Sequence, residues 1–342
     1  MNKQMKAILI MLMIWWCTLS LGVNVSGTKE TRSVIYVNND NINGPWNGSQ
    51  LYPYRHIQDA LNHALAGDFI SVANGTYYEH LTINSSLTGL TINKWTNPPS
   101  EHDTNPPTLY GNDTGTGINI KASDVTIALI TINHYGQEGR DTDIYIDKGV
   151  DSVSIHNCTL NSSYCGIWIK RDLPYDSYHQ IKYNIISNMS SRGISMILSD
   201  YVMIISNKIA HCGIGAYLHD CNHCIISGNN FSFCTNPTYG TGLALDIGFL
   251  NSVLHNTFCQ NTFGLGTVGT RSSIIQSNNF IDNKNTPAYF ITFDIYSGDA
   301  WSNNYYKGSH NLLLKLIGGH FVFAKITLPW IKFDFFPSRD PN

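Results

Sequence analysis

Charged residues are scarce in this chain of 342 residues, since Asp, Glu, Lys and Arg make up only 13% of it. The 21 basic and 24 acidic residues leave a net charge of −3, so the basic footprint that nucleic-acid binding requires is missing. No membrane span is expected in the mature chain, and the apolar run 7–16 that precedes it is shorter than the roughly 20 residues that a span needs.

The N-terminus has the pattern of a secretory signal peptide. Lys3 and Lys6 precede the apolar run 7–16, and small residues follow at 25–28. We predict a signal peptide over residues 1–27 and a secreted or cell-surface location, with an uncleaved N-terminal anchor as the alternative.

Eight Asn-x-Ser/Thr triplets follow the predicted signal peptide. Each is a potential glycan site if the producing cell has the machinery, so the pattern agrees with an extracellular glycoprotein. The triplets begin at Asn47, Asn74, Asn84, Asn112, Asn157, Asn161, Asn188 and Asn230.

An Asn recurs after short apolar strands at steps of 22 to 27 residues. This period suits a coil of three strands per turn, with each rung about 4.8 Å above the last, so that the Asn side chains form a structural ladder. Leucine-rich repeats share the period, but their Leu-x-x-Leu-x-Leu pattern is missing. The predicted ladder consists of Asn157, Asn184, Asn207, Asn229, Asn256, Asn278 and Asn303.

A second strand in each repeat begins after a glycine. Strand alternation predicts that residues one and three after the glycine point inward, and that residues two and four point outward. The glycines are Gly166, Gly193, Gly213, Gly242 and Gly264.

Upstream of the repeats lie a strand at 34–37, an amphipathic helix at 56–65, Gly67-Asp68 and the turn Gly-Thr-Tyr77. Together with the Asn repeat, these features resemble the N-terminal cap and coils of the pectin-lyase-like superfamily, most closely its NosD-like repeat proteins, over residues 34–306. The resemblance implies an all-β fold, a right-handed parallel β-helix with a short N-terminal capping helix.

This fold predicts three segments after the signal peptide. Residues 28–120 form the N-terminal cap and first coils, 121–306 the β-helix repeats, and 307–342 a C-terminal segment that closes the coil.

The outward stripe of the glycine-led strand is the predicted binding surface for a polysaccharide or surface glycan. Aromatic faces stack on sugar rings, and neighbouring ionic groups read their substituents. The alternative is that these aromatic side chains pack under a loop. The candidates are Tyr145, Trp168, Lys170, Tyr217 and Asp246.

Catalysis is left undecided. A polysaccharide lyase needs carboxylates for Ca²⁺ and a basic residue, and Asp141, Asp143 and Asp147 with Lys170 and Arg171 are the weak candidates. The alternative is that these aspartates cap turns.

A glycoside hydrolase needs two carboxylates roughly 5 to 10 Å apart, but Asp147 and Asp246 lie four rungs, or roughly 19 Å, from each other. Asp200 and Asp220 match on adjacent rungs, counted from their glycines, and could hold a cation or be two solvated turn residues.

Cysteine and histidine allow two further interpretations. Cys212 and Cys234 fall at matching places in adjacent rungs, which suits either a disulfide or stacked thiols. A copper or zinc site is the less favoured alternative to Ca²⁺, because strand alternation sends neighbouring residues to opposite faces. Its weak candidates are His219, Cys221, His223 and Cys224.

Three functions therefore stay open. The first is a surface β-helix that binds or processes polysaccharide, as a lyase or a glycoside hydrolase if it is an enzyme. The second is a structural or adhesive repeat protein. The third is an extracytoplasmic copper-handling accessory protein, which only the NosD-like resemblance implies.

Overall fold

The computed structural model describes residues 32–96, 105–139, 141–293, 298–307, 314–323 and 326–341, without the side chains of 171–175, 314, 323 and 326. The predicted signal peptide lies outside these residues. A compact unit begins at Ser33. Within the described part, no helix has the length and apolar character to cross a membrane.

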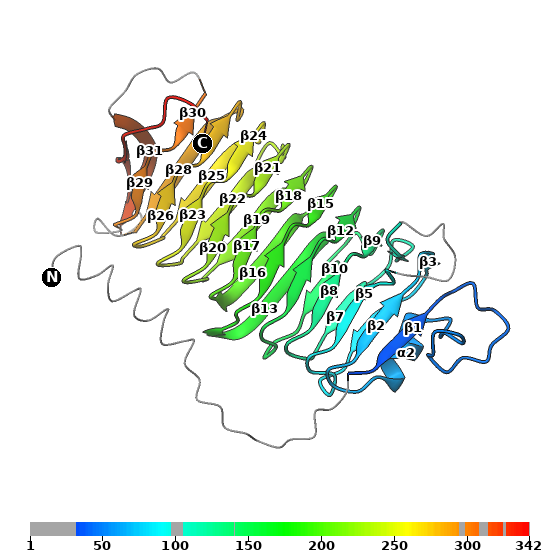
Figure 1. Cartoon of the computed structure of the whole chain (residues 1–342). Coiled ribbons are helices and arrows are strands. Elements are labelled where there is room, and N and C mark those ends of the chain that lie inside the picture. Colours follow the sequence, from blue (N-terminus) through cyan, green and yellow to red (C-terminus); the bar gives the residue numbers. More distant parts are fainter. Residues whose placement is uncertain are drawn as a thin grey trace. The chain divides into compact units, whose positions relative to one another are not determined.

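The unit is a parallel coil in which each turn contributes one strand to each of three walls (Figure 1). The first wall consists of β1 (Val34–Val37), β2 (Phe69–Val72), β5 (Thr91–Lys94), β8 (Thr126–Ala128), β11 (Ser154–His156), β14 (Gln180–Lys182), β17 (Met203–Ile205), β20 (Ile225–Ser227), β23 (Ser252–Leu254), β26 (Ile274–Gln276), β29 (Ala300–Ser302) and β32 (Ile326–Phe335).

The second wall consists of β3 (Thr76–Tyr77), β6 (Thr108–Tyr110), β9 (Thr131–Asn133), β12 (Thr159–Asn161), β15 (Ile185–Ser187), β18 (Lys208–Ala210), β21 (Asn230–Ser232), β24 (Thr257–Cys259), β27 (Asn279–Ile281) and β30 (Tyr305–Tyr306). The third wall consists of β4 (Leu81–Ile83), β7 (Ile118–Ile120), β10 (Thr142–Ile146), β13 (Cys165–Asp176), β16 (Arg192–Asp200), β19 (Ile214–His219), β22 (Thr241–Asp246), β25 (Phe263–Val268), β28 (Thr286–Thr292) and β31 (Leu314–Phe323).

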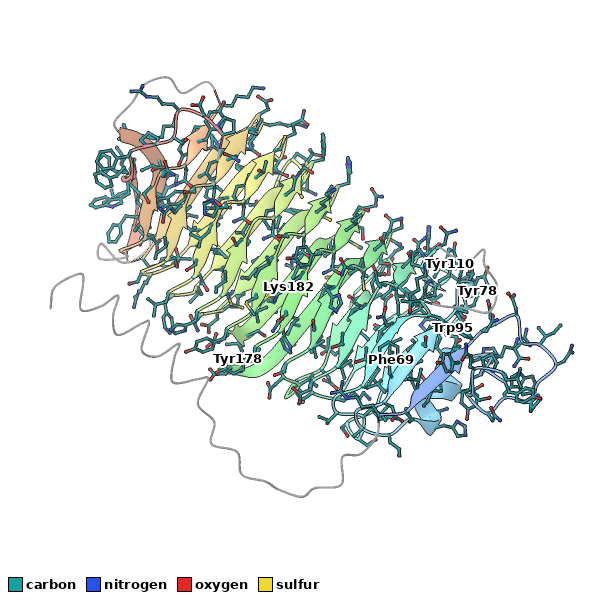
Figure 2. All side chains as sticks on the ribbon, in the orientation of Figure 1. Phe69, Tyr78, Trp95, Tyr110, Tyr178 and Lys182 are labelled. Atoms are coloured by element: carbon teal, nitrogen blue, oxygen red, sulfur yellow. The ribbon has the colours of Figure 1, made fainter. Side chains whose placement is uncertain are left out.

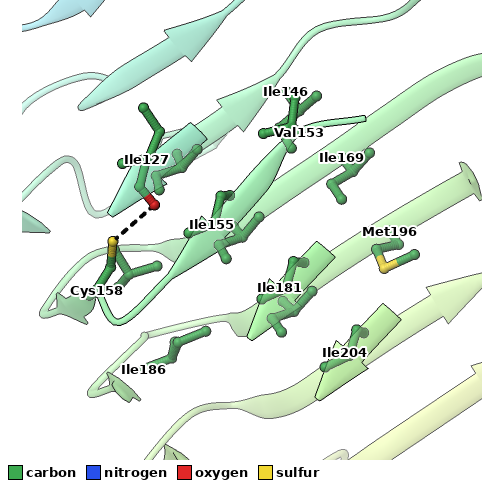
Figure 3. Packing of buried hydrophobic residues seen from close by; sticks show 14 of the residues in the cluster. Ile127, Ile146, Val153, Ile155, Cys158, Ile169, Ile181, Ile186, Met196 and Ile204 are labelled. Atoms are coloured by element: carbon green, nitrogen blue, oxygen red, sulfur yellow. Dashed lines mark hydrogen bonds between the residues drawn. The ribbon is translucent and has the colours of Figure 1, made fainter. Parts of the chain in front are cut away.

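Alternation along these short strands separates core from surface. Phe69 and Lys182, labelled in Figure 2, belong to the first wall and are only half-buried. The central residues Ile155, Ile181 and Ile204 of the same wall are buried and stack from coil to coil in Figure 3. The core is therefore one continuous column of aliphatic and aromatic side chains.

The corner between the first and second walls contains the Asn ladder. Asn256 shows its bonding: its Oδ1 accepts the backbone N–H of Asn229 at 2.9 Å, and its Nδ2 donates to Oδ1 of Asn278 at 3.0 Å. The same pattern links Asn184, Asn207, Asn229, Asn256, Asn278 and Asn304.

Two predicted ladder positions are wrong by one residue. A residue with positive φ comes directly before each ladder residue, and Asn157 (φ 54°) and Asn303 (φ 54°) occupy that outer position. Asn tolerates the left-handed conformation that the turn requires, which is why it recurs there too. The inward places belong to Cys158, whose N–H donates to Oδ1 of Asn184, and to Asn304.

The two ends of the coil are covered differently. At the start, α2 (Ile57–His63) buries Ile57 and Leu61, and the Glu79 carboxylate accepts the backbone N–H of Ile57 at 2.9 Å. At the other end, β31 and β32 pair as an antiparallel hairpin, and each also continues a parallel wall. The predicted all-β parallel β-helix with a short N-terminal helix is confirmed.

Candidate functional site

The outward face of the third wall carries two parallel columns of side chains. The first column pairs Tyr145 with Trp168, then continues through Ser195, Tyr217, Ala244 and Gly266 to Tyr289. The second column pairs Lys170 with Ile197, followed by His219, Asp246 and Val268. We call this double column the third-wall face.

Aromatic rings dominate its first column. The rings of Tyr145 and Trp168 lie 6.3 Å apart at 80°, and both side chains are half-buried. Ser195 on the next coil is buried, and neither its Oγ nor Nε1 of Trp168 has a hydrogen-bond partner among the described residues. An unsatisfied donor and acceptor on adjacent coils leave bonding capacity that a ligand could use after a small side-chain movement.

A cluster of polar side chains follows at Tyr217. Oδ2 of Asp246 accepts a hydrogen bond from the Tyr217 hydroxyl at 2.9 Å and lies 2.8 Å from Nδ1 of His219. A carboxylate only accepts, so Nδ1 of His219 carries the proton in this contact. The Arg192 guanidinium stands 4.5 Å from the centre of the Tyr217 ring.

Burial, followed by the hydrogen bond to Asp246, raises the pKa of Tyr217 to about 12. The phenol therefore stays protonated at neutral pH and acts as a hydrogen-bond donor or a weak acid. Two proton-bearing groups share one carboxylate on this face.

His219 was predicted only as a weak metal candidate and not as part of the outward stripe, because the stripe was counted from the wrong glycine. Gly215, and not Gly213, is in register with Gly193 and Gly242, since a Cβ on Gly215 would lie 2.3 Å from the carbonyl oxygen of Gly242. Counted from Gly215, positions two and four are Tyr217 and His219, so Tyr217 moves into the column of Trp168. Arg192, which was also missed, directly precedes Gly193.

The weak lyase candidates do not converge. Asp143 is fully buried, its Oδ1 accepts a hydrogen bond from Ser163 Oγ at 2.5 Å, and burial raises its pKa well above the ordinary value. Asp141 lies against Gly136. Lys170 lies on the third-wall face next to Asp147, which follows Ile146. The side chain of Arg171 lies outside the described residues.

The register also separates Asp200 from Asp220. Asp200 pairs with Asp176, and its Oδ1 accepts the backbone N–H of Asn222 at 2.8 Å. Asp220 comes two residues before Asn222, where the wall turns. The prediction of matching rung positions for Asp200 and Asp220 is therefore wrong, for the same glycine miscount.

The cysteine and histidine candidates fall on different sides of the wall. Cys221 and Cys224 are buried in the core, whereas the His223 ring stacks on Tyr201 outside, with centroids 4.7 Å apart. No three His, Cys, Asp or Glu side chains gather as a metal site in the described part of the chain.

Of the two alternatives for Cys212 and Cys234, the structure has the stacked thiols and not the disulfide. Cys212 and Cys234 are buried free thiols, and each Sγ approaches the carbonyl oxygen two residues before it. Stacked parallel strands keep such Cβ atoms about 4.8 Å apart, more than the roughly 3.8 Å that a disulfide prefers.

Comparisons with known proteins agree with the parallel β-helix fold. The chain is similar to XylC in complex with xylose, at 12% identity and a TM-score of 0.63 over 89% of this chain and 73% of that one. It is similar to the alginate lyase AlyF-OU02 with G6, at 12% identity and a TM-score of 0.55 over 86% and 64%. It is also similar to the pectate lyase Pel9A, at 12% identity and a TM-score of 0.51 over 79% and 78%.

Identities this low show the fold alone, and no curated protein matches the chain. The narrower resemblance to NosD-like proteins stays a prediction. The family described as "Right handed beta helix region" matches residues 112–290, which is more than half of the chain. The chain therefore belongs to this right-handed β-helix family.

Proposed function

We propose that this protein binds a polysaccharide or surface glycan along the third-wall face. The observation that carries the proposal is the shared register of Tyr145, Trp168 and Tyr217 with the polar pair His219 and Asp246. Aromatic rings repeated along parallel coils about 4.8 Å apart can meet successive sugar rings, and the flanking polar groups can bind hydroxyls.

Two cationic side chains of this face can bind an acidic glycan. Lys170 and Arg192 flank the aromatic column on either side, and a guanidinium binds carboxylates or sulfates through two parallel hydrogen bonds. The similar structures include an alginate lyase and a pectate lyase, which supports a polysaccharide ligand of this kind.

Catalysis at the same place is the second candidate function. Tyr217 and His219 both carry protons toward Asp246, which is an arrangement that can donate and accept a proton. A polysaccharide lyase is favoured over a glycoside hydrolase, because Asp246 is the only carboxylate among the described residues of this polar cluster.

We also propose that the protein works outside the cytoplasm. The support is the signal-peptide pattern of residues 1–27 and the accessibility of the Asn-x-Ser/Thr triplets. All eight acceptor asparagines are exposed or half-exposed: Asn47, Asn74, Asn84, Asn112, Asn157, Asn161, Asn188 and Asn230.

Titration of the purified protein with acidic and neutral polysaccharides, with Ca²⁺ or EDTA, tests the proposal. Trp168→Ala should weaken binding by about tenfold to a hundredfold, because an aromatic ring contributes about 1.5–3 kcal/mol when it is buried. Trp330→Ala on β32, a tryptophan outside the third-wall face, is the control and should bind as the wild type does.

The same panel separates binding from catalysis. Unsaturated products that disappear in Tyr217→Phe and His219→Ala, while binding persists, would establish a lyase. Equal binding by wild type and Trp168→Ala, or no binding across the panel, would reject the glycan proposal in favour of a structural or adhesive repeat protein.

A further inference from the structure

A cavity of about 280 Å³ opens at the corner between the third and first walls, outside the third-wall face. It lies at the turns that follow β19, β22 and β25. The residues that matter for its chemistry are Asp220, Ile247, Phe249, Gly269, Arg271 and Phe293. We call it the corner pocket.

One of the residues that line the corner pocket has no side chain. Leu198, Asp220, Ile247 and Gly269 occupy equivalent places on successive coils, and all have positive φ, between 51° and 63°. A Cβ added to Gly269 would lie 3.0 Å from Cδ2 of Phe293 and 3.7 Å from Cγ1 of Ile247. A Cβ at this place would press on the Phe293 ring, so the glycine lets that ring lie close to the backbone beside Ile247.

A row of stacked aromatic rings lies along the same corner of the coil, next to the corner pocket. Tyr178 and Tyr201 stack at 5.4 Å, and Tyr201 and His223 stack at 4.7 Å. Figure 2 labels Tyr178 at the edge of the coil. The ring planes of Phe249 and His223 make an angle of 77°, so Phe249 does not continue the stack. Its ring plane lies roughly parallel to the coil axis. A ring in this orientation can offer a face to a ligand beside it.

The walls of the corner pocket are apolar and its rim is charged. Ile247, Phe249 and Phe293 are 47%, 43% and 51% exposed, which is unusual for large apolar side chains that lie together. Asp220 supplies hydrogen-bond acceptors, and Arg271 supplies donors. Among the described lining residues, these two opposite charges balance each other, which favours a neutral ligand over an acid or an amine.

We propose that the corner pocket is a second carbohydrate site, which holds one neutral pyranose ring. The apolar walls suit the C–H face of a sugar, and the two charged groups can each bind a pair of its hydroxyls. The volume lies just below the roughly 300–1,000 Å³ of sites for drug-sized ligands, so it fits one ring and not an oligosaccharide. This site shares no residue with the third-wall face.

Ligand-observed NMR with free glucose, galactose, mannose, xylose, galacturonate and glucosamine tests the proposal. Gly269→Leu should fill the corner pocket and weaken binding of the neutral sugars by more than about tenfold. The backbone can accept this change, because Leu198 has a φ of 56° at the equivalent place. Gly149→Leu is the matched control, since Gly149 has a φ of 78° and no atom within 4 Å of its added Cβ.

A second variant keeps the proposal testable if Gly269→Leu does not fold. Phe249→Ala should also weaken binding by about tenfold while the melting temperature changes little, because this ring is exposed. Trp168→Ala should leave monosaccharide binding intact, which separates this site from the third-wall face.

Several results would overturn the corner-pocket proposal. They are wild-type affinity in folded Gly269→Leu, loss of monosaccharide binding in Trp168→Ala, preference for the charged sugars, and no binding of any sugar in the panel. Polysaccharide binding that depends on Trp168 but not on Gly269 would leave the third-wall proposal standing alone.

Discussion

Replacing Asn256 by Ala tests whether the Asn ladder stabilises the coil. The side chain is fully buried and makes four hydrogen bonds, from the Asn229 backbone N–H and Nδ2 to its Oδ1, and from its Nδ2 to Ile226 O and Asn278 Oδ1. At about 1 kcal/mol for each bond, the free energy of unfolding should fall by about 4 kcal/mol.

Urea denaturation followed by circular dichroism measures this loss. The control is Asn230→Ala, an exposed residue of β21 for which no side-chain hydrogen bond is found in the described residues; it should cost less than about 0.5 kcal/mol. A cost near 1 kcal/mol for Asn256→Ala, or equal costs for the two variants, would refute the reasoning that the ladder bonds stabilise the fold.

The neighbours Asn303 and Asn304 test the register of the same ladder. Asn304→Ser should be strongly destabilising, because its amide bonds to Ile275 O, to Asn278 and to the buried carboxylate of Asp334. Asn303→Ser should cost little, since serine takes the same left-handed place elsewhere, as at Ser277 (φ 55°). If Asn303→Ser were instead the more destabilising of the two variants, the ladder register predicted from the sequence spacing would be correct.

Three further outcomes follow from the buried groups. Burial raises the pKa of Asp143 above its ordinary 3.8, so this group favours the folded state at low pH, and that contribution is lost as the pH rises from 3.8 through the folded pKa. Asp143→Asn keeps an acceptor for Ser163, so above about pH 4 its free energy of unfolding should fall less with rising pH than that of the wild type. Urea denaturation at a series of pH values measures this, and the same pH dependence in both proteins would contradict the prediction. Phe258→Ala should lower the free energy of unfolding by about 3–5 kcal/mol, because the ring is fully buried in the aromatic stack; a loss below 1 kcal/mol would mean that the core refills the space. Among the described cysteines, Cys259 should react first with a thiol reagent and the six buried ones only on unfolding, and mass spectrometry after alkylation would show any other order.

The candidate site was only partly accessible to sequence reasoning. Trp168 and Tyr145 were predicted as outward neighbours because each lies in a strand whose flanking residues are apolar, and alternation is a local property. The place of His219 on the third-wall face was not predicted, because Gly213 and Gly215 both precede apolar residues and no local signal tells which of them stacks on Gly242.

The sequence alone determined the coil and its two faces. A period of 22 to 27 residues, short alternating strands and a recurring Asn leave a three-walled parallel β-helix as the arrangement that buries the apolar residues and bonds the amides. The tertiary structure alone decided which side chains meet across coils. Register depends on hydrogen bonds between segments more than 20 residues apart, so a change of one or two residues at a turn moved Asn304 into the ladder and brought His219 to Asp246.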